Sequence, residues 1–344
     1  MDSKMNGEIS IHGGRGEASM DNKNINSKDV DQYPVVGNND VVHYYINKQK
    51  RSGGYYDYSL AAHIRENGKR TTKILTTFGR ERPVFHQPNL IKGYCEDHLK
   101  TMPPASVDLI IDDPPYGATE LPWDKAPDWE SLAGLYHNVL KDNGLVYIFG
   151  KQPSLIDVYN SFSELFDFRF EVIWNRNNVP WSSNFKPLPV HENIFVFCKK
   201  GAAVEGTKFY LKNVMTEGRP YNQNRNKKSP TQRKYNKYVA KVGNKRYPKS
   251  ILDILPPGST PEYTGYPTQK PLELMRWIIL ASTQRNDIVL DPHMGSGTTL
   301  LAALWLCRRS VGVELYQGAY DIASKRISDI IDRLPTQYLL DSTT

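Results

Sequence analysis

Residues 107–116 read VDLIIDDPPY, and this stretch decides the fold. Its apolar, β-branched beginning predicts a buried strand. The strand ends at Pro114 and Pro115, because proline has no backbone donor and its φ is fixed. The turn therefore places the carboxylate of Asp113 and the ring of Tyr116 at the carboxyl end of a strand. In open α/β sheets, ligands bind at that edge.

The turn suits the transfer of a group to a weakly nucleophilic nitrogen. The carboxylate of Asp113 and the carbonyl of Pro114 can each accept a hydrogen bond from one exocyclic amine, which draws the nitrogen lone pair out of conjugation. The ring of Tyr116 can stack on the base that carries this amine. The alternative is a proline turn with a solvated aspartate, because a four-residue match also arises by chance.

Residues 288–299 read IVLDPHMGSGTT and precede an apolar helix expected over 300–306. A strand, a glycine-rich turn and a helix amino terminus form a nucleotide-type site, because glycine lets the backbone approach a ligand. A P-loop NTPase is disfavoured: Gly297 is followed by Thr298 instead of lysine, and the upstream glycine is missing. The next strand ends in Glu314, where an acid can bind ribose hydroxyls.

Three motifs resemble those of the amino-group DNA methyltransferases, which make N6-methyladenine or N4-methylcytosine. They are DPPY at 113–116, TQKP at 268–271 and DPHMGSGTT at 291–299. In that family the first is catalytic, the second begins the cofactor half and the third binds S-adenosylmethionine. The catalytic motif precedes the cofactor motif, an order that resembles the β group, whose single sheet is circularly permuted. The resemblance covers about residues 84–335.

The resemblance implies an α/β fold with a doubly wound, mostly parallel, seven-stranded type of sheet, Rossmann-like, and S-adenosyl-L-methionine as the cofactor. Asp291 would approach the methionine ammonium, the glycine turn the methionine moiety and Glu314 the ribose, and no metal is implied. Thr268 and Gln269 would touch the cofactor carboxylate, although a simple helix cap is nearly as good an interpretation. The catalytic residues so predicted are Asp113, Pro114, Pro115 and Tyr116, and the cofactor-binding residues are Asp291, Pro292, Gly295, Ser296, Gly297, Thr298, Glu314, Thr268 and Gln269.

Several positions match the family less well. Gly93 is followed by Tyr94 and Cys95, where the family has an acid near the cofactor adenine, so Tyr94 and Glu96 are the remaining candidates for that contact. Tyr266 replaces the histidine before the TQKP motif. Residues 121–124, LPWD, are similar to the family's Trp-Asp after a short mobile loop. The stretches WNR at 174–176 and HE at 191–192 resemble weaker motifs, and we favour a structural role for the histidine because it opens a strand.

The composition is compatible with a polyanionic partner and excludes little. The 344 residues carry a net charge of +7, with a pI near 9.0. The first thirty positions are polar and no apolar run approaches 18 residues, so we expect a cytoplasmic protein, nucleoid-associated and bacterial or phage-encoded. Three cysteines without a Cys-x-x-Cys pair argue against a disulfide framework and structural zinc. None follows a proline, unlike the nucleophile of cytosine-C5 methyltransferases.

The chain divides by composition. Residues 1–32 are polar without hydrophobic period and are expected to be disordered. Residues 33–83 form a small appendage with tyrosines among basic residues, where we expect a short helix beginning at Ser59. This appendage either contacts nucleic acid or packs on the core. The methyltransferase core is assigned to 84–335, and 336–344 form a tail.

The core contains a basic insert, assigned to 199–262. Between positions 199 and 249 there are fifteen Lys or Arg and only two acids. The resemblance places the target-recognition region here, and a solvated loop is the alternative. The DNA-binding residues predicted in it are Lys227, Lys228, Arg233, Lys234 and Lys237.

The function predicted from these observations is site-specific methylation of adenine N6 in double-stranded DNA, with S-adenosylmethionine as donor and with base flipping. N4-cytosine methylation in the same pocket is the nearest alternative, and an RNA methyltransferase is less favoured because its motif more often begins with Asn. A catalytically silent DNA-binding protein belongs to a different class. The resemblance also leaves open a homodimer and a cognate restriction endonuclease.

Overall fold

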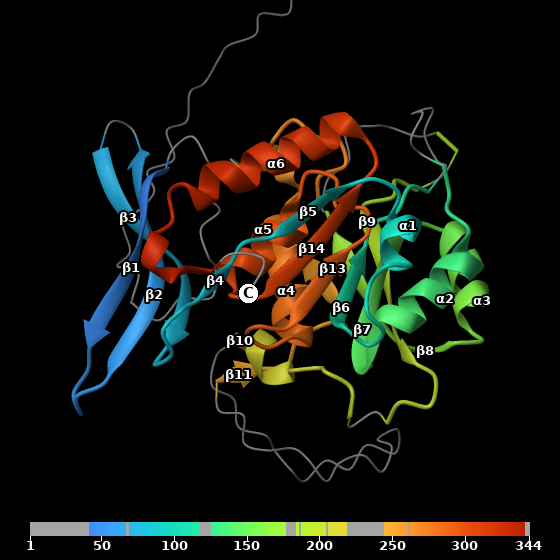
Figure 1. The fold of residues 1–344 in the computed structure, drawn as a ribbon, viewed down its shortest axis with the longest axis horizontal. Coiled ribbons are helices and arrows are strands. Elements are labelled where there is room, and N and C mark those ends of the chain that lie inside the picture. Colours follow the sequence, from blue (N-terminus) through green and yellow to red (C-terminus); the bar gives the residue numbers. More distant parts are fainter. Residues whose placement is uncertain are drawn as a thin grey trace, which may run out of the picture. The chain divides into compact units, whose positions relative to one another are not determined.

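A central sheet of eight strands carries the site (Figure 1). The computed structural model describes residues 41–66, 69–116, 125–176, 184–185, 187–203, 206–218, 244–260 and 262–340. Within them the strand order is β12-β8-β9-β7-β6-β13-β14-β5. The bounds are β5 (Asn89–Lys92), β6 (Val107–Asp112), β7 (Leu140–Gly150), β8 (Phe166–Asn175), β9 (His191–Lys199), β12 (Ile251–Asp253), β13 (Ile288–Asp291) and β14 (Arg309–Glu314).

The sheet is mostly parallel, with β9 antiparallel to both of its neighbours, β7 and β8. Strands β6, β13 and β14 are parallel and adjacent, as are β14 and β5. The predicted Rossmann-like architecture is confirmed. The short strand β12 at the edge was not predicted, and it comes from the range assigned to the basic insert.

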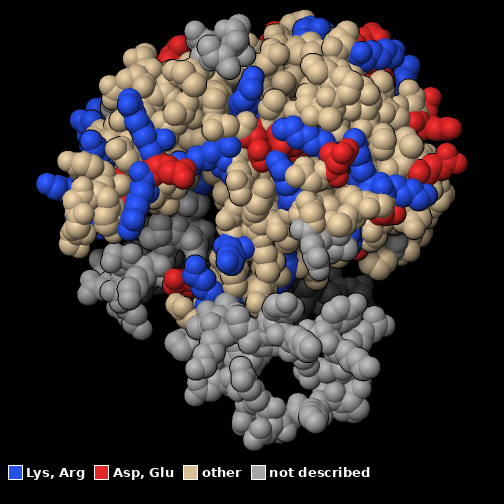
Figure 2. Space-filling model, turned by 60° about the horizontal axis from the view of Figure 1, so that its bottom comes forward, with Lys and Arg blue, Asp and Glu red and all other residues tan. Residues whose placement is uncertain are grey.

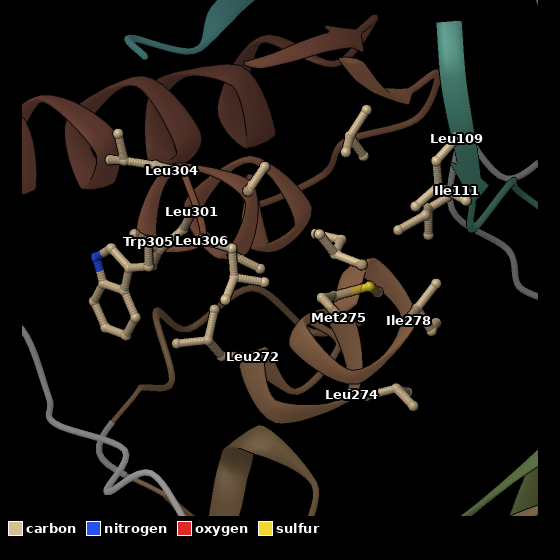
Figure 3. Packing of buried hydrophobic residues seen from close by; sticks show 14 of the residues in the cluster. Leu109, Ile111, Leu272, Leu274, Met275, Ile278, Leu301, Leu304, Trp305 and Leu306 are labelled. Atoms are coloured by element: carbon tan, nitrogen blue, oxygen red, sulfur yellow. The ribbon is translucent and has the colours of Figure 1, made fainter. Parts of the chain in front are cut away.

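Helices cover both faces of the sheet, as the doubly wound prediction requires. They are α1 (Cys95–Leu99), α2 (Trp129–Val139), α3 (Ser154–Phe162), α4 (Leu272–Ser282), α5 (Thr298–Trp305) and α6 (Gln317–Ile331). Strand β6 alternates between the two cores: Leu109 and Ile111 join the cluster under α4 and α5, whereas Ile110 joins the cluster under α2 and α3. Figure 3 shows part of the first cluster, to which α4 contributes Met275, α5 contributes Leu301 and β6 contributes Leu109.

Local chemistry explains where α2 begins and where β7 follows. Asp128 caps α2, because its carboxylate accepts hydrogen bonds from the backbone of Glu130 and Ser131. Helix α2 ends at Val139, and the chain enters β7 directly. Gly144 lies within β7, where a Cβ would come within 2.9 Å of the backbone oxygen of Asp108.

The appendage is an antiparallel sheet of β1 (Val41–Lys50), β2 (Tyr56–Glu66) and β3 (Lys69–Gly79). The helix expected at Ser59 is wrong, because those residues pair on both sides as the central strand β2. Alternating Leu60, Ala62 and Ile64 are buried there, and a Leu–Ile spacing of four fits helix and strand equally well. The sheet packs on the core, where the Arg276 guanidinium donates to the Leu75 carbonyl at 3.0 Å.

The two ends of the basic insert also rest on the core. Residues 211–214 form a 3-10 helix beside α4, and the backbone of Tyr210 donates to Ala281 O at 2.6 Å. Lys208 pairs with Asp108 at 2.5 Å and with Asp287 at 3.0 Å. Two short pairs complete the described strands, β10 (Thr216–Glu217) with β11 (Lys245–Arg246), and β4 (Phe85–His86) with β15 (Leu339–Leu340).

Several predictions fall outside the described residues: the tail 1–32, the LPWD stretch and all five predicted DNA-binding residues. Figure 2 shows Lys and Arg spread over the face that holds β10 and β11, with acidic side chains among them. In the described part of the chain this face therefore carries both signs of charge. Among the described helices, none combines the length and the apolar composition needed to cross a membrane.

Candidate active site

The site lies at the carboxyl edge of the central sheet, where three adjacent strands end. Leu109 of β6 is in register with Val289 of β13, and β13 continues in register with β14. Because these strands are parallel, Asp113, the glycine turn after Asp291 and Glu314 all emerge at the same edge. The structure thus brings together the two motifs that are about 180 residues apart in the sequence.

Both carboxylate oxygens of Asp113 have partners. The hydroxyl of Tyr116 donates to Oδ1 at 2.5 Å, and the ammonium of Lys270 donates to Oδ2. Burial raises the pKa of Asp113, although the positive charge of Lys270 opposes this effect. Burial also raises the pKa of Tyr116 well above its usual value, so the phenol remains a donor.

Lys270 lies between two carboxylates. Its Nζ is 3.5 Å from Oε2 of Glu192, at the start of β9, and 5.4 Å from the centre of the Phe149 ring. Burial lowers the pKa of Lys270, but the charges of Asp113 and Glu192 outweigh burial, and the net pKa is raised. The lysine therefore carries its positive charge throughout the physiological pH range.

Glu192 is anchored by two further cations. Its Oε1 lies 3.3 Å from Nη1 of Arg176, at the end of β8, and 4.0 Å from Nζ of Lys151, which follows β7. Arg176 is itself fixed, because its Nη2 donates to the carbonyl of Pro189 at 2.6 Å. Burial raises the pKa of Glu192, but these cations and Lys270 lower it below the usual value. The ends of β6, β7, β8 and β9 are thus joined through charged side chains.

The turn after β13 is shaped to approach a ligand. Gly295 and Gly297 have φ values of +50° and +74°, which L residues rarely adopt. A Cβ on Gly297 would lie 3.1 Å from Cβ of Ala323 in α6. The turn is fixed to β14 because the backbone N–H of Gly295 donates to Oε2 of Glu314 at 2.9 Å. A bare backbone cradle at a helix amino terminus, flanked by two carboxylates, fits the methionine portion of S-adenosylmethionine.

Asp291 lies at the entrance of this turn with its side chain buried. Burial raises its pKa to about 7; a hydrogen bond from Thr299 opposes the shift, and the charges of Asp112 and Asp113 add to it. That Asp113 contributes shows that its carboxylate and the glycine turn are close enough to interact. A carboxylate poised in this way can bind an ammonium group.

Glu314 has the placement expected of a ribose ligand. The backbone N–H groups of Gly295 and Tyr316 each donate to one of its oxygens, and the remaining lone pairs of the carboxylate are available to hydroxyl groups. Beside it, the backbone N–H of Gly93 donates to Glu314 O at 3.0 Å. The next residue on each side, Tyr94 and Leu315, has an exposed side chain.

A second cluster supports the base of the site. Asp112 is fully buried, and it accepts a hydrogen bond from the hydroxyl of Tyr136 at 2.8 Å and pairs with Nδ1 of His293 at 2.7 Å. Burial lowers the pKa of His293, but Asp112 outweighs burial and the net pKa is well above the usual value. His293 Nε2 lies 3.5 Å from Sγ of Cys95. The cluster ties the cofactor turn to β6 and to α1.

The other predicted cofactor residues make hydrogen bonds within the protein that shape the turn and the loop before α4. Ser296 and Thr298 both accept hydrogen bonds from Arg326, which holds the turn against α6. Gln269 fastens its own loop: its Oε1 accepts from Thr264, and its Nε2 donates to Glu262 O at 3.0 Å. Thr268 is exposed, and its hydroxyl bonds to the Tyr266 phenol. The two side chains thus fasten their own loop, and the N-cap of α4 is Pro271, without a side-chain bond. Their contact with the cofactor carboxylate stays a prediction.

Sequence reasoning missed Lys270, Glu192, Asp112 and His293 as members of the site. Each of them adjoins a residue that was singled out: Lys270 follows Gln269, and Asp112 precedes Asp113. The signal in the sequence was that these four residues are charged or titratable and lie in or beside the recognised motifs. A charged residue buried at a sheet edge needs a partner of opposite charge. Which partner it meets depends on the packing of distant segments.

The comparisons with known proteins agree with this geometry. A family model described as DNA methylase, covering N6 and N4 methyltransferases, matches residues 107–325. The DNA adenine methyltransferase YhdJ of Escherichia coli is 30% identical over 258 residues, which cover 70% of this chain and 81% of that protein. The type II methyltransferase M2.MboI of Moraxella bovis is 25% identical and covers 75% and 96%. The PvuII cytosine-N4 DNA methyltransferase structure has a TM-score of 0.51 at 16% identity, covers 73% and 95%, and supports the fold.

The fold and the site define an S-adenosylmethionine-dependent methyltransferase. The chain belongs to the N6/N4 DNA methylase family, and its substrate is DNA. The resemblance drawn from the sequence and the cofactor predicted from it are confirmed.

Proposed function

We propose that the protein methylates the exocyclic N6 of adenine at specific sites in double-stranded DNA. The observation that carries the proposal is the position of Asp113 beside the cofactor turn. Asp as the first motif residue leans toward adenine, and the E. coli relative is named an adenine methyltransferase. N4-cytosine methylation uses the same geometry and is the alternative that the experiment below distinguishes.

The target amine is inaccessible inside a duplex, so the base is extruded into the site, at a cost of a few kcal/mol. Asp113 and the carbonyl of Pro114 accept hydrogen bonds from the amine and orient its lone pair toward the glycine turn. Pro115 fixes the turn, and Tyr116 provides a ring for stacking. Alignment of the amine and polarisation by these acceptors account for the rate enhancement in this scheme.

S-adenosylmethionine, when bound, supplies a methyl group on a positively charged sulfur. The N–C bond forms as the S–C bond breaks, the bonding electron pair stays on sulfur, and the amine loses one proton. Asp113 is the nearest base for that proton. Asp291 would bind the methionine ammonium, the backbone of 295–297 the methionine moiety and Glu314 the ribose, and Tyr94 and Glu96 stay the candidates for the adenine contact.

The experiment is methyl transfer to duplex DNA, followed by mass spectrometry of the nucleosides. We expect N6-methyladenine from the wild type; N4-methylcytosine would overturn the choice of base and leave the site assignment intact. Asp113→Ala should abolish transfer and leave S-adenosylmethionine binding nearly unchanged. The matched control is Asp142→Ala, because Asp142, near the start of β7, is an exposed aspartate that also pairs with a lysine, Lys199 of β9. Turnover retained by Asp113→Ala would reject the role of that carboxylate.

The DNA contacts of Lys227, Lys228, Arg233, Lys234 and Lys237 belong to this proposal on sequence grounds alone. Phosphate contacts from such residues position a duplex without reading its sequence. A homodimer and a cognate restriction endonuclease also stay predictions from the family resemblance.

A further inference from the structure

Both carboxylate oxygens of Asp113 already accept hydrogen bonds from the protein's own side chains. Tyr116 donates to Oδ1 and Lys270 to Oδ2. Under the proposed function, the exocyclic amine must donate to one of these oxygens, so one resident donor has to leave. A donor that leaves a buried carboxylate needs a second acceptor, because an unpaired buried charge is costly.

Lys270 has such an acceptor within reach. Oε2 of Glu192 is buried and lies 3.5 Å from Lys270 Nζ, a longer contact than the one that Lys270 makes with Asp113. The Glu192 carboxylate stays in place when the lysine moves, because Arg176 and Lys151 pair with its other oxygen, Oε1. The Phe149 ring lies beside the ammonium, 5.4 Å away, and offers it a favourable π-face.

We infer that Lys270 and Glu192 are positioning residues of the methyl-transfer site. Until the target base enters, the Lys270 ammonium donates to the oxygen of Asp113 that binds the amine; when the base enters, the ammonium moves to Oε2 of Glu192 and donates to it instead. The inference rests on the proposed function. It explains why a buried glutamate oxygen lies beside a lysine that already donates to Asp113.

The exchange keeps every charge paired. Before base entry the ammonium neutralises Asp113, and afterwards Glu192 neutralises the ammonium while the amine satisfies Asp113. Lys270 also opposes the rise that burial causes in the pKa of Asp113, and this favours the ionised carboxylate, which is the stronger acceptor. Lys270 and Glu192 therefore have opposite effects on the pKa of Asp113: the lysine lowers it and the glutamate raises it.

The charged and titratable groups around Asp113 come from several elements. Asp112 and Tyr116 flank it on the β6 segment, Glu192 comes from β9 and Arg176 from the end of β8. The others are Lys151 after β7, Lys270 and Tyr266 before α4, and Asp291 and His293 at the end of β13. Of these, Lys270 lowers the pKa of Asp113 most, and Glu192 raises it.

The test is the single-turnover methyl-transfer rate as a function of pH, measured with duplex DNA and S-adenosylmethionine. In Lys270→Met the acidic limb of the profile should move to higher pH, since Asp113 loses its cation. In Glu192→Gln the limb should move to lower pH, and the rate on the plateau should fall by up to about 100-fold, because Lys270 now stays on Asp113. Lys270→Arg and Glu192→Asp keep the charges and should keep the limb near its wild-type position.

Lys208→Met is the matched control, because Lys208 also lies between two aspartates, Asp108 and Asp287, at the opposite end of β6 and β13. It should lower the urea midpoint and leave the limb in place. Equal losses in Lys270→Met and Glu192→Gln without opposite movements would overturn the inference. If Lys270→Met or Glu192→Gln does not fold, the acidic limbs of the pH profiles of Lys270→Arg and Glu192→Asp are compared with the wild type instead. A shifted acidic limb in both of these variants would overturn the inference. A wild type that transfers no methyl group would refute the proposed function itself, and an active Asp113→Ala would reject the role of that carboxylate.

Discussion

The raised pKa of Asp291 makes a quantitative prediction about the cofactor. If Asp291 binds the methionine ammonium, only its ionised form binds well. With a pKa of about 7, half of the Asp291 carboxylates are ionised at pH 7 and roughly one in a hundred at pH 5. The affinity for S-adenosylmethionine should therefore fall about 50-fold between pH 7 and pH 5, which corresponds to about 2.3 kcal/mol.

The sign follows from linkage. The ammonium stabilises the charged carboxylate and lowers the pKa of Asp291 in the complex, so binding releases a proton whenever the free protein holds one. The affinity is highest above pH 7 and decreases as the pH falls through the pKa of the free protein. His293 does not contribute to this slope, because its pKa lies well above the usual value and it stays protonated across the window.

The assay is isothermal titration of S-adenosylmethionine at pH 5, 6 and 7 in buffers of different ionisation enthalpy, which also counts the released protons. Asp291→Asn should bind more weakly at pH 7 and show almost no dependence on pH. A wild-type Kd that is flat from pH 7 to pH 5, or an equal slope in Asp291→Asn, would refute the assignment of the ammonium site.

Two other predictions test the cofactor turn and the basic insert. Gly297→Ala should lower the free energy of unfolding by about 2–5 kcal/mol, from the left-handed backbone and the 3.1 Å contact with Ala323. By contrast, Gly134→Ala, at an open position inside α2, should raise the free energy of unfolding by about 1 kcal/mol. Urea unfolding of the two variants measures the difference, and equal effects would contradict the reasoning. Replacing Lys227, Lys228, Lys234 and Lys237 with Gln should make the slope of log Kobs for duplex DNA against log salt less steep by up to about 3.6, and an unchanged slope would remove the insert from the DNA-contacting surface.

Much of the fold could be predicted because each strand of the core carries its own signal. The run before Asp113 is apolar at every position except its two aspartates, as a strand covered on both faces must be. The appendage shows the limit of this reasoning. Ser59 and the residues after it satisfy a helix start and a helical spacing, but pairing with β1 and β3 overrides that local preference.

The site could be predicted in part for a related reason. Glycines at positive φ and a carboxylate after a proline-terminated strand are visible in one segment. Lys270, Glu192 and Arg176 are different, since their roles exist only where the ends of β8 and β9 and the segment before α4 meet. A sequence shows that such residues are charged, and the packing shows which charges face each other.

The charges at this edge of the sheet suit the reaction as a whole. Asp112, Asp113, Glu192, Asp291 and Glu314 converge there, and S-adenosylmethionine carries positive charge on both its ammonium and its sulfur. Attraction of the cofactor therefore includes a contribution that disappears on methyl transfer, because sulfur loses its charge when the S–C bond breaks. Burial strengthens this contribution, since carboxylates in a low-dielectric site interact more strongly with a cation than they would in water. The same burial disfavours an unpaired carboxylate, and Lys270 and His293 supply the counter-charge for Asp113 and Asp112.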